Sequence, residues 1–118
     1  MIIRNSIGKV YLACGATDFR KSINGLALLV QYSFDLDPFS NCLFVFCNRN
    51  KDKLKILQWE HDGFWLHYKR LEKGKFKWPD NAEGKAMGVT ERELGWLLDG
   101  LPVNQPRARK AVAERIMI

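Results

Sequence analysis

The sequence predicts an α+β fold in which a mostly antiparallel sheet, a meander, packs against an N-terminal helix and a C-terminal helix. First, the run Cys42–Cys47 is apolar at every position, which is typical of a central strand covered on both faces. Second, residues 53–60 and 64–71 are β-rich segments separated by an Asp-Gly turn, which indicates a hairpin. Third, Thr90 and Glu93 form a capping box that opens a helix.

The N-terminal part of the sheet begins with a short apolar segment. Residues 10–13 read as a strand that a turn at residues 15–18 ends. Apolar residues then recur three and four positions apart from Ile23 to Phe34, which predicts a helix, and residues 35–41 form a loop. The candidate N-caps of this helix are Ser22, Thr17 and Asp18.

The meander continues from the central strand toward the C-terminal helix. We expect a turn at residues 49–52, a turn at residues 61–63, and strand character again at Phe76 and Trp78 before Pro79 ends the sheet. Four apolar side chains should be buried in this sheet, namely Leu43, Val45, Leu54 and Ile56.

The C-terminal part is expected to be a loop followed by a helix. Residues 80–88 are polar and contain glycine, so they predict a linker or mobile loop. Beyond the capping box, Leu94, Leu97 and Leu98 form an apolar stripe that ends at Gly100. The tail at residues 102–118 is basic and reads either as a helix that orders on a partner or as a frayed end. Two tryptophans, Trp78 and Trp96, are expected core anchors.

Length and composition favour one soluble domain spanning residues 1–118. The chain has 118 residues, 47% of them hydrophobic and 27% charged, and its longest apolar run, Leu26 to Val30, is far too short to cross a bilayer. No secretory signal is visible, so we expect a cytoplasmic protein. Three cysteines in no repeated spacing predict reduced thiols. Cys42 and Cys47 would point to opposite faces of one strand, so no metal site is expected.

Positive charge is concentrated in one stretch of the chain. Residues 48–78 contain nine Lys or Arg and four Asp or Glu, which accounts for most of the formal net charge of +6. A cationic sheet face with aromatic rings between the charges suits a nucleic acid, although alternating lysines on a wet sheet face can also serve solubility. The candidate nucleic-acid-binding residues are Arg20, Lys21, Arg49, Lys51, Lys53, Lys55, Trp59, Trp65, His67, Lys69, Arg70, Lys75 and Lys77.

Two arrangements of these residues are predicted. If the strands pair in register, Lys53, Lys55 and Trp59 should lie beside Trp65, His67 and Lys69, and beside Lys75 and Lys77, as one cationic stripe. Near the first helix, one interpretation of Asp18 and Arg20 is a cap with a salt bridge. The alternative is a phosphate site formed by Arg20, Lys21 and free backbone N–H groups at the helix N-terminus.

Catalytic chemistry has little support in the sequence. The acids and bases that a nuclease would need are present as Asp18, Glu60, His61, Asp62 and His67, but their spacing selects no active site. Phosphate-binding loops and metalloprotease motifs are absent from the chain. We therefore expect a protein that is not an enzyme and has no cofactor.

Four segments in order resemble one known family: V-Y-L-A-C-G-A-T-D-F-R-K-S-I-N-G-L (10–26), D-P-F-S-N-C-L-F-V-F (37–46), K-L-K-I-L-Q-W-E-H-D-G-F-W-L (53–66) and K-R-L-E-K-G-K-F-K-W-P (69–79). The chain is similar to the TnpB accessory proteins, which are encoded by the second reading frame of bacterial insertion sequences of the IS66 family. The resemblance covers a core of about residues 10–101. The tail from Val103 onward departs from the family pattern.

The resemblance implies a non-catalytic accessory role in DNA transposition, with a separate transposase cutting and joining the strands. It carries over no catalytic residue and no cofactor. Asp18, Arg20 and Lys21 match the family's T-D-x-R-K motif, and residues 69–72 match its K-R-L-E motif. Two functions stay open: a DNA-binding factor associated with the bacterial nucleoid, or an adaptor that docks on the transposase or another accessory protein without touching DNA.

Overall fold

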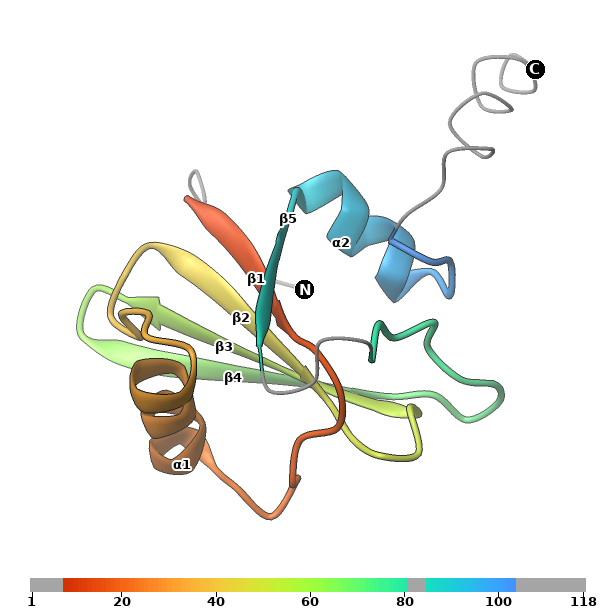
Figure 1. Ribbon diagram of the computed structural model, residues 1–118, viewed down its shortest axis with the longest axis horizontal. Helices are drawn as coiled ribbons and strands as arrows, with labels where there is room; N and C mark the ends of the chain where they lie inside the picture. The colour runs from red at the N-terminus through yellow and green to blue at the C-terminus, as the bar shows by residue number, and fades with distance from the viewer. Residues whose placement is uncertain (1–7, 81–84, 104–118) are drawn as a thin grey trace.

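The computed structural model describes residues 8–80 and 85–103, which form one five-stranded sheet and two helical segments (Figure 1). The strands lie in the order β4-β3-β2-β1-β5. Their bounds are β1 Lys9–Ala13, β2 Cys42–Cys47, β3 Lys53–Glu60, β4 Gly63–Arg70 and β5 Ala86–Val89, and the helices are α1 Ile23–Leu28, continued by the π-helical turn η1 Leu29–Ser33, and α2 Glu91–Leu98.

The sheet is mixed, with mostly antiparallel pairing. β2, β3 and β4 form the antiparallel meander that the sequence predicts. β1, however, runs parallel to β2, because α1 lies between them in the chain and returns the polypeptide to the same end of the sheet. β5 pairs antiparallel with the free side of β1. The α+β class is therefore correct, and the meander covers three of the five strands.

Two segments after the hairpin differ from the prediction. Residues 86–88, expected in a loop, form β5 together with Val89, because β1 offers them a strand to pair with. Their short sequence has no strand pattern of its own. Phe76 and Trp78, expected in a strand, lie outside the sheet as buried side chains of an irregular segment. Their alternation therefore reflects packing against the sheet and not strand pairing. Residues 81–84 of the expected loop lie outside the described residues.

The α1 side of the sheet carries one of two hydrophobic clusters. Leu26 and Val30 from the helical segment pack with Phe44, Phe46 and Leu57 from the sheet, and all five are buried. Between them, α1 and η1 span residues 23–33, close to the expected helix. The N-cap position is Ser22, whose side chain makes no capping hydrogen bond.

The opposite side of the sheet is covered by α2 and by the segment around Phe76 and Trp78. The cluster there contains Leu94 and Leu97 together with all four predicted core residues, Leu43, Val45, Leu54 and Ile56. Leu54 is 1% exposed and Ile56 is 4% exposed, so the predicted inward side of β3 is confirmed. Trp78 is buried as expected, whereas Trp96 is only partly buried.

Local signals account for both ends of α2. Thr90 Oγ1 accepts a hydrogen bond from the backbone N–H of Glu93 at 3.0 Å, and Glu93 Oε1 accepts one from the N–H of Thr90 at 2.8 Å. This is the capping box that the sequence predicts. The chain leaves the helix through Gly100, whose φ of +88° lies in the left-handed region that glycine tolerates. Within the described ranges, none of the helices is both long and apolar enough to span a bilayer.

The hairpin between β3 and β4 has a two-residue loop. Glu60 pairs directly with Gly63, so only His61 and Asp62 connect the strands, and His61 takes the left-handed backbone conformation with φ of 61°. The sequence predicts Gly63 inside the turn, but Gly63 is the first residue of β4. This one-residue difference decides which side chains of β4 lie beside those of β3.

Candidate nucleic-acid interface

The ends of the two parallel strands bring several predicted site residues together. The chain leaves the carboxyl end of β1 into residues 14–21 and the carboxyl end of β2 into residues 48–52, and the two segments lie at the same edge of the sheet. Crevices outside the carboxyl ends of parallel strands are common ligand sites in α/β sheets.

Backbone hydrogen bonds hold these segments against each other. The N–H of Thr17 donates to the carbonyl oxygen of Cys47 at 2.8 Å, joining the segment after β1 to the end of β2. The N–H of Gly15 donates to the carbonyl oxygen of Pro79 at 3.0 Å, joining it to the segment after Trp78. Three segments that are distant in the sequence are thereby fixed at one end of the sheet.

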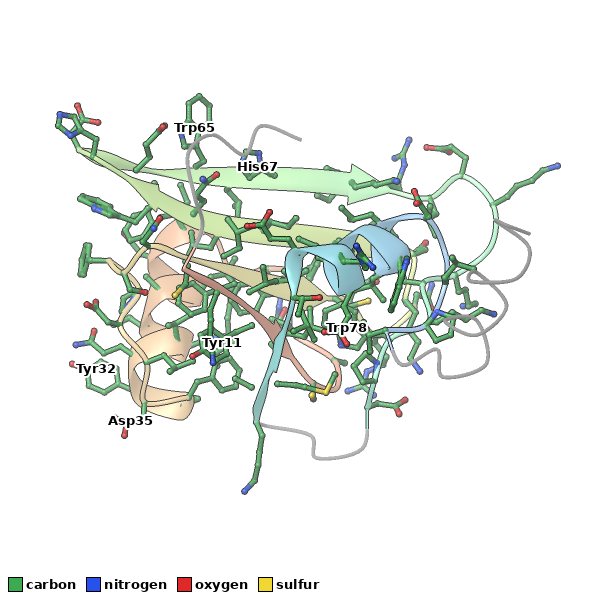
Figure 2. All side chains as sticks on the ribbon, turned by 90° about the horizontal axis from the view of Figure 1, so that it is seen from above. Tyr11, Tyr32, Asp35, Trp65, His67 and Trp78 are labelled. Atoms are coloured by element: carbon green, nitrogen blue, oxygen red, sulfur yellow. The ribbon has the colours of Figure 1, made fainter. Side chains whose placement is uncertain are left out.

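Trp78, labelled in Figure 2, also holds the segment after β1 in place. Its indole Nε1 donates to the carbonyl oxygens of Ala13 at 3.1 Å and Gly15 at 2.9 Å. Ala13 is the last residue of β1, and Gly15 follows it by two positions. A buried carbonyl needs such a donor, so Trp78 is both a core residue and a support for this edge of the sheet.

Asn48 organises the turn between β2 and β3. Its Oδ1 accepts from the backbone N–H groups of Asp52 and Lys53, each at 3.0 Å, and its Nδ2 donates to Asp52 Oδ1 at 2.7 Å. The hydrogen bond from Asn48 lowers the pKa of Asp52. Lys75 Nζ donates to the carbonyl oxygen of Asn50 at 2.8 Å, which places the ammonium group against the turn.

Three adjoining hollows run along this edge, with volumes of about 560, 240 and 450 Å³. The first and second share Arg49, and the second and third share Lys51. We call them together the cationic groove. Its charged lining residues are Arg20, Arg49, Lys51, Lys75 and Lys77, with the carboxylates of Asp18 and Asp80.

The lining has a surplus of positive charge. Lys51 Nζ lies 2.7 Å from Asp80 Oδ2, so this pair is neutral overall. Arg49 and Lys77 have no hydrogen-bond or ion-pair partner among the described residues, and the partner of Lys75 is an uncharged carbonyl. Among the described residues, these three cations therefore form no ion pair with a carboxylate, which favours a positive potential along the groove.

Asp18 and Arg20 form the salt bridge that the sequence allows. Arg20 Nη2 lies 2.7 Å from Asp18 Oδ2, and the guanidinium hydrogen bonds hold the pKa of Asp18 far below its usual range. The backbone N–H of Arg20 donates to Asp18 Oδ1 and that of Lys21 to the Asp18 carbonyl oxygen. These two N–H groups are occupied, so a phosphate beside Arg20 and Lys21 would have to use other backbone N–H groups, and this site stays a prediction. Asp18 also caps no helix, because α1 begins only at Ile23.

The predicted single stripe is wrong, because its two halves lie on opposite faces of the sheet. Residues directly opposite in an antiparallel pair share a face, and Lys55 lies opposite Tyr68 while Ile56 lies opposite His67. Lys53, Lys55 and Trp59 therefore lie on the α1 side, whereas Trp65, His67 and Lys69 lie on the α2 side. A three-residue turn would have placed the two sets on one face. The two-residue loop shifts the register by one residue, which moves every β4 side chain to the opposite face.

On the α1 side, Lys55 is committed to the fold. Its Nζ donates to the carbonyl oxygens of Phe19 and Lys21, both at 3.0 Å, and lies 4.7 Å from the centre of the Phe19 ring. Trp59 contacts Phe39 and Phe64 with ring centres 5.0 Å away in each case. These contacts tie the loop before α1 and the loop before β2 to β3.

The cations of β4 also have internal partners. Lys69 Nζ donates to the carbonyl oxygen of Leu98 at 3.1 Å, a favourable position for a cation because the end of α2 carries partial negative charge. Arg70 Nε lies 2.9 Å from Glu72 Oε2. Lys53, opposite Arg70, is a partly buried cation whose side chain has no partner within the described ranges.

Trp65 and His67 are neighbours on the outer strand, and both are labelled in Figure 2. Their rings are stacked with centres 6.1 Å apart, and Trp65 Nε1 donates to Glu60 Oε1 at 2.6 Å. His67 Nε2 lies 2.9 Å from Gln58 Oε1. Burial lowers the pKa of His67, which favours the neutral imidazole.

The cysteines follow the predicted geometry. Cys42 belongs to the cluster on the α1 side and Cys47 to the cluster on the α2 side, so the two thiols diverge. Burial raises the pKa of Cys47 to about 12, which makes this thiol unreactive. Among the residues that the structure describes, no three His, Cys, Asp or Glu side chains are grouped to hold a metal ion.

Three residues that shape this edge were not among the sequence-predicted site residues. Asn48 stabilises the turn between β2 and β3 through Asp52, and Asp80 pairs with Lys51. Trp78 donates to the carbonyl oxygen of Gly15, just after β1. The Asn four positions before Asp52 was a recognisable signal for a side-chain-stabilised turn. Asp80 had no such signal, because its partner is 29 positions away.

Comparison with known proteins gives a consistent family assignment. Residues 8–108 match the model of the family described as IS66 Orf2 like protein. Uncharacterized protein y4hO of Sinorhizobium fredii is 38% identical over 99 residues, covering 84% of this chain and 85% of the relative. Uncharacterized protein y4jC of the same organism is 34% identical over 93 residues, covering 79% of each chain. No solved structure matches the chain.

Proposed function

The chain belongs to the family of IS66 Orf2-like proteins, and from this premise we propose that it is a non-catalytic accessory protein of DNA transposition that binds nucleic acid through the cationic groove. Membership of the family makes the protein an accessory component of a transposition system. We propose, beyond this, that the protein binds DNA, that it has no enzymatic activity, and that the cationic groove is where DNA makes contact. A role on bacterial DNA would place the protein at the nucleoid.

The surplus of positive charge in the groove carries this proposal. Arg49, Lys75 and Lys77 form no ion pair with any carboxylate that the structure describes, and they extend from segments that hydrogen bonds fix in place. A phosphate backbone releases counterions when such cations neutralise it, and this release drives binding of any sequence. Both carboxylates of the groove, Asp18 and Asp80, already pair with cations, so neither is set up as a metal ligand or general base.

Other predicted residues contribute less directly to this surface. Lys21 is exposed and follows Arg20, which lines the groove, and Lys53 follows the turn that carries Arg49. Lys55 supports the fold, as its two hydrogen bonds to carbonyl oxygens show. We therefore centre the proposed DNA contact on the groove and not on the open sheet face.

The experiment is a titration of labelled duplex and single-stranded DNA at several salt concentrations, read by fluorescence anisotropy. Three uncompensated cations predict that log Kobs falls with log salt with a slope of about −3 on duplex DNA. The double variant Arg49→Glu/Lys77→Glu should lose about a hundredfold in affinity near 0.1 M salt and flatten the slope by about 2, because each lost phosphate contact costs roughly tenfold there.

Arg92→Glu is the control for net charge, because it makes the same change of charge as the single variant Arg49→Glu at the other end of the molecule. Arg92 is exposed in the first turn of α2, and β5, which leads into α2, ends opposite Val10 near the start of β1. We expect this variant to bind DNA almost as the natural chain does. Equal losses of affinity in Arg92→Glu and in the single variant Arg49→Glu would mean that net charge, and not the groove, determines binding.

The adaptor function is the alternative outcome of the same titration. If the natural chain does not bind DNA even at low salt but binds its transposase, and Arg49→Glu/Lys77→Glu breaks that complex, the groove is a protein-docking surface. A docking surface of this kind needs the partner protein for any complex to form, whereas a phosphate-binding surface does not.

A further inference from the structure

The outer strand β4 has no strand paired along its free edge in the part of the chain that the structure describes. It ends the sheet order β4-β3-β2-β1-β5 and lies at one margin of the sheet in Figure 1. Hydrogen-bonded pairs alternate along an antiparallel ladder, so every second residue of β4 turns its backbone N–H and C=O away from β3. Such a row of groups can pair with another strand.

This edge lacks the features that usually block strand pairing. β4 pairs with β3 at eight consecutive positions, so it has no bulge, and it contains no proline. Gly63 to Tyr68 includes no Lys, Arg, Asp or Glu. Two aromatic side chains are instead exposed on it, Trp65 at 48% and Tyr68 at 55%. Natural edge strands are normally short, bulged or charged, so an eight-residue strand with this sequence favours a partner.

We propose that two copies of this chain join through β4 as antiparallel neighbours, with Leu66 on the two-fold axis. A two-fold axis perpendicular to the sheet keeps the α1 sides of both copies on one side, so residues of equal parity face each other across the interface. With Leu66 opposite itself, Phe64 faces Tyr68 of the second copy. Two five-stranded sheets become one continuous ten-stranded sheet.

Charge complementarity selects both this partner and this register. β4 is preceded by Asp62 at one end and finishes with Arg70 at the other, and antiparallel self-pairing places each end against the opposite end of the second copy. In the Leu66-centred register, Asp62 lies opposite Arg70. A shift of two residues in one direction would place Asp62 opposite Glu72, and in the other direction opposite Tyr68.

The remaining pairs in this register are also favourable. Trp65 lies opposite His67 of the second copy, which extends the stack that these two rings already form within one chain. Within its own chain, Arg70 pairs with Glu72 and lies opposite the like charge of Lys53, so an incoming Asp62 carboxylate would meet two cations and one carboxylate. Aromatic and opposite-charge pairs across strands are the kinds that stabilise antiparallel sheets.

The test is sedimentation equilibrium of the purified full chain without DNA, at micromolar to submillimolar concentrations. We expect the apparent mass to rise with concentration from the chain mass of 13.7 kDa to twice that value. Asp62→Arg and Arg70→Asp should each weaken the dimer by about tenfold, because each change turns two attracting pairs into two repelling pairs. The double variant Asp62→Arg/Arg70→Asp should restore it.

Tyr68→Lys is a further variant that places a charge at the middle of the edge and should abolish the dimer. Both Asp62 and Arg70 are exposed, as is Tyr68, so thermal melts should show that all these variants stay folded. The proposal fails if the natural chain remains at the single-chain mass, if the dimer survives Tyr68→Lys, or if the double swap does not rescue the single reversals. A β4 edge that pairs only with the transposase would show the first of these results. Because no DNA is present, the outcome is independent of the proposed function.

Discussion

Replacing Lys55 with Met tests whether this lysine is a structural support or a solvent-facing charge. Lys55 was predicted to face a nucleic acid, but its ammonium group donates to the carbonyl oxygens of Phe19 and Lys21 and lies over the Phe19 ring. Met retains the apolar stem that packs on the sheet and removes only the charged donor. The loss of stability therefore measures these contacts.

The expected loss follows from the exposure of each partner. The bond to Phe19 is partly buried, and a hydrogen bond from a charged donor in such a position contributes about 1.5 kcal/mol. The bond to Lys21 is exposed, so water replaces it at almost no cost. The cation–π contact adds about 0.5 kcal/mol. The sum is about 2 kcal/mol, which lowers the melting temperature by roughly 8 °C in a domain of this size.

Urea unfolding followed by circular dichroism measures the effect, and Lys53→Met is the matched control. Lys53 lies on the same face of β3, two residues away, and its side chain makes no hydrogen bond or ion pair within the described ranges. We expect that control to change the free energy of unfolding by less than about 0.5 kcal/mol. If the two variants lose the same stability, the contacts of Lys55 with Phe19 and Lys21 do not stabilise the fold.

Two further predictions concern buried polar groups. Trp78→Phe should lower the free energy of unfolding by about 2 kcal/mol in urea titrations, because the carbonyl oxygens of Ala13 and Gly15 lose their buried donor, and an unchanged midpoint would contradict this role. Burial depresses the pKa of His67 in the folded state, so the unfolded chain binds this proton first as the pH falls. His67 should thus contribute stability that is full above its ordinary pKa of 6.5 and lost as the pH falls toward the folded value, and His67→Gln should flatten the difference between urea midpoints at about pH 7 and about pH 5.

Local patterns in the sequence were sufficient for several elements of the fold. The two-sided apolar run of β2, the inward Leu54 and Ile56 of β3, and the capping box of α2 were all predicted and are present. Each depends on residues within one or two turns of helix or one strand, where periodicity and capping chemistry decide the outcome. The divergence of Cys42 and Cys47 follows from strand parity alone.

Only the tertiary structure decided which side chains share a surface and which of them are free to bind a partner. The two-residue loop at His61 and Asp62 sets the register between β3 and β4, and a register change of one residue moves Trp65 and Lys69 to the other face of the sheet. The partners of Lys55 and of Lys69 are distant in the sequence, so no local pattern shows that these cations are already engaged. The cationic groove likewise exists because hydrogen bonds between distant segments bring the ends of two parallel strands together, and charge counted along the chain carries no information about such distances.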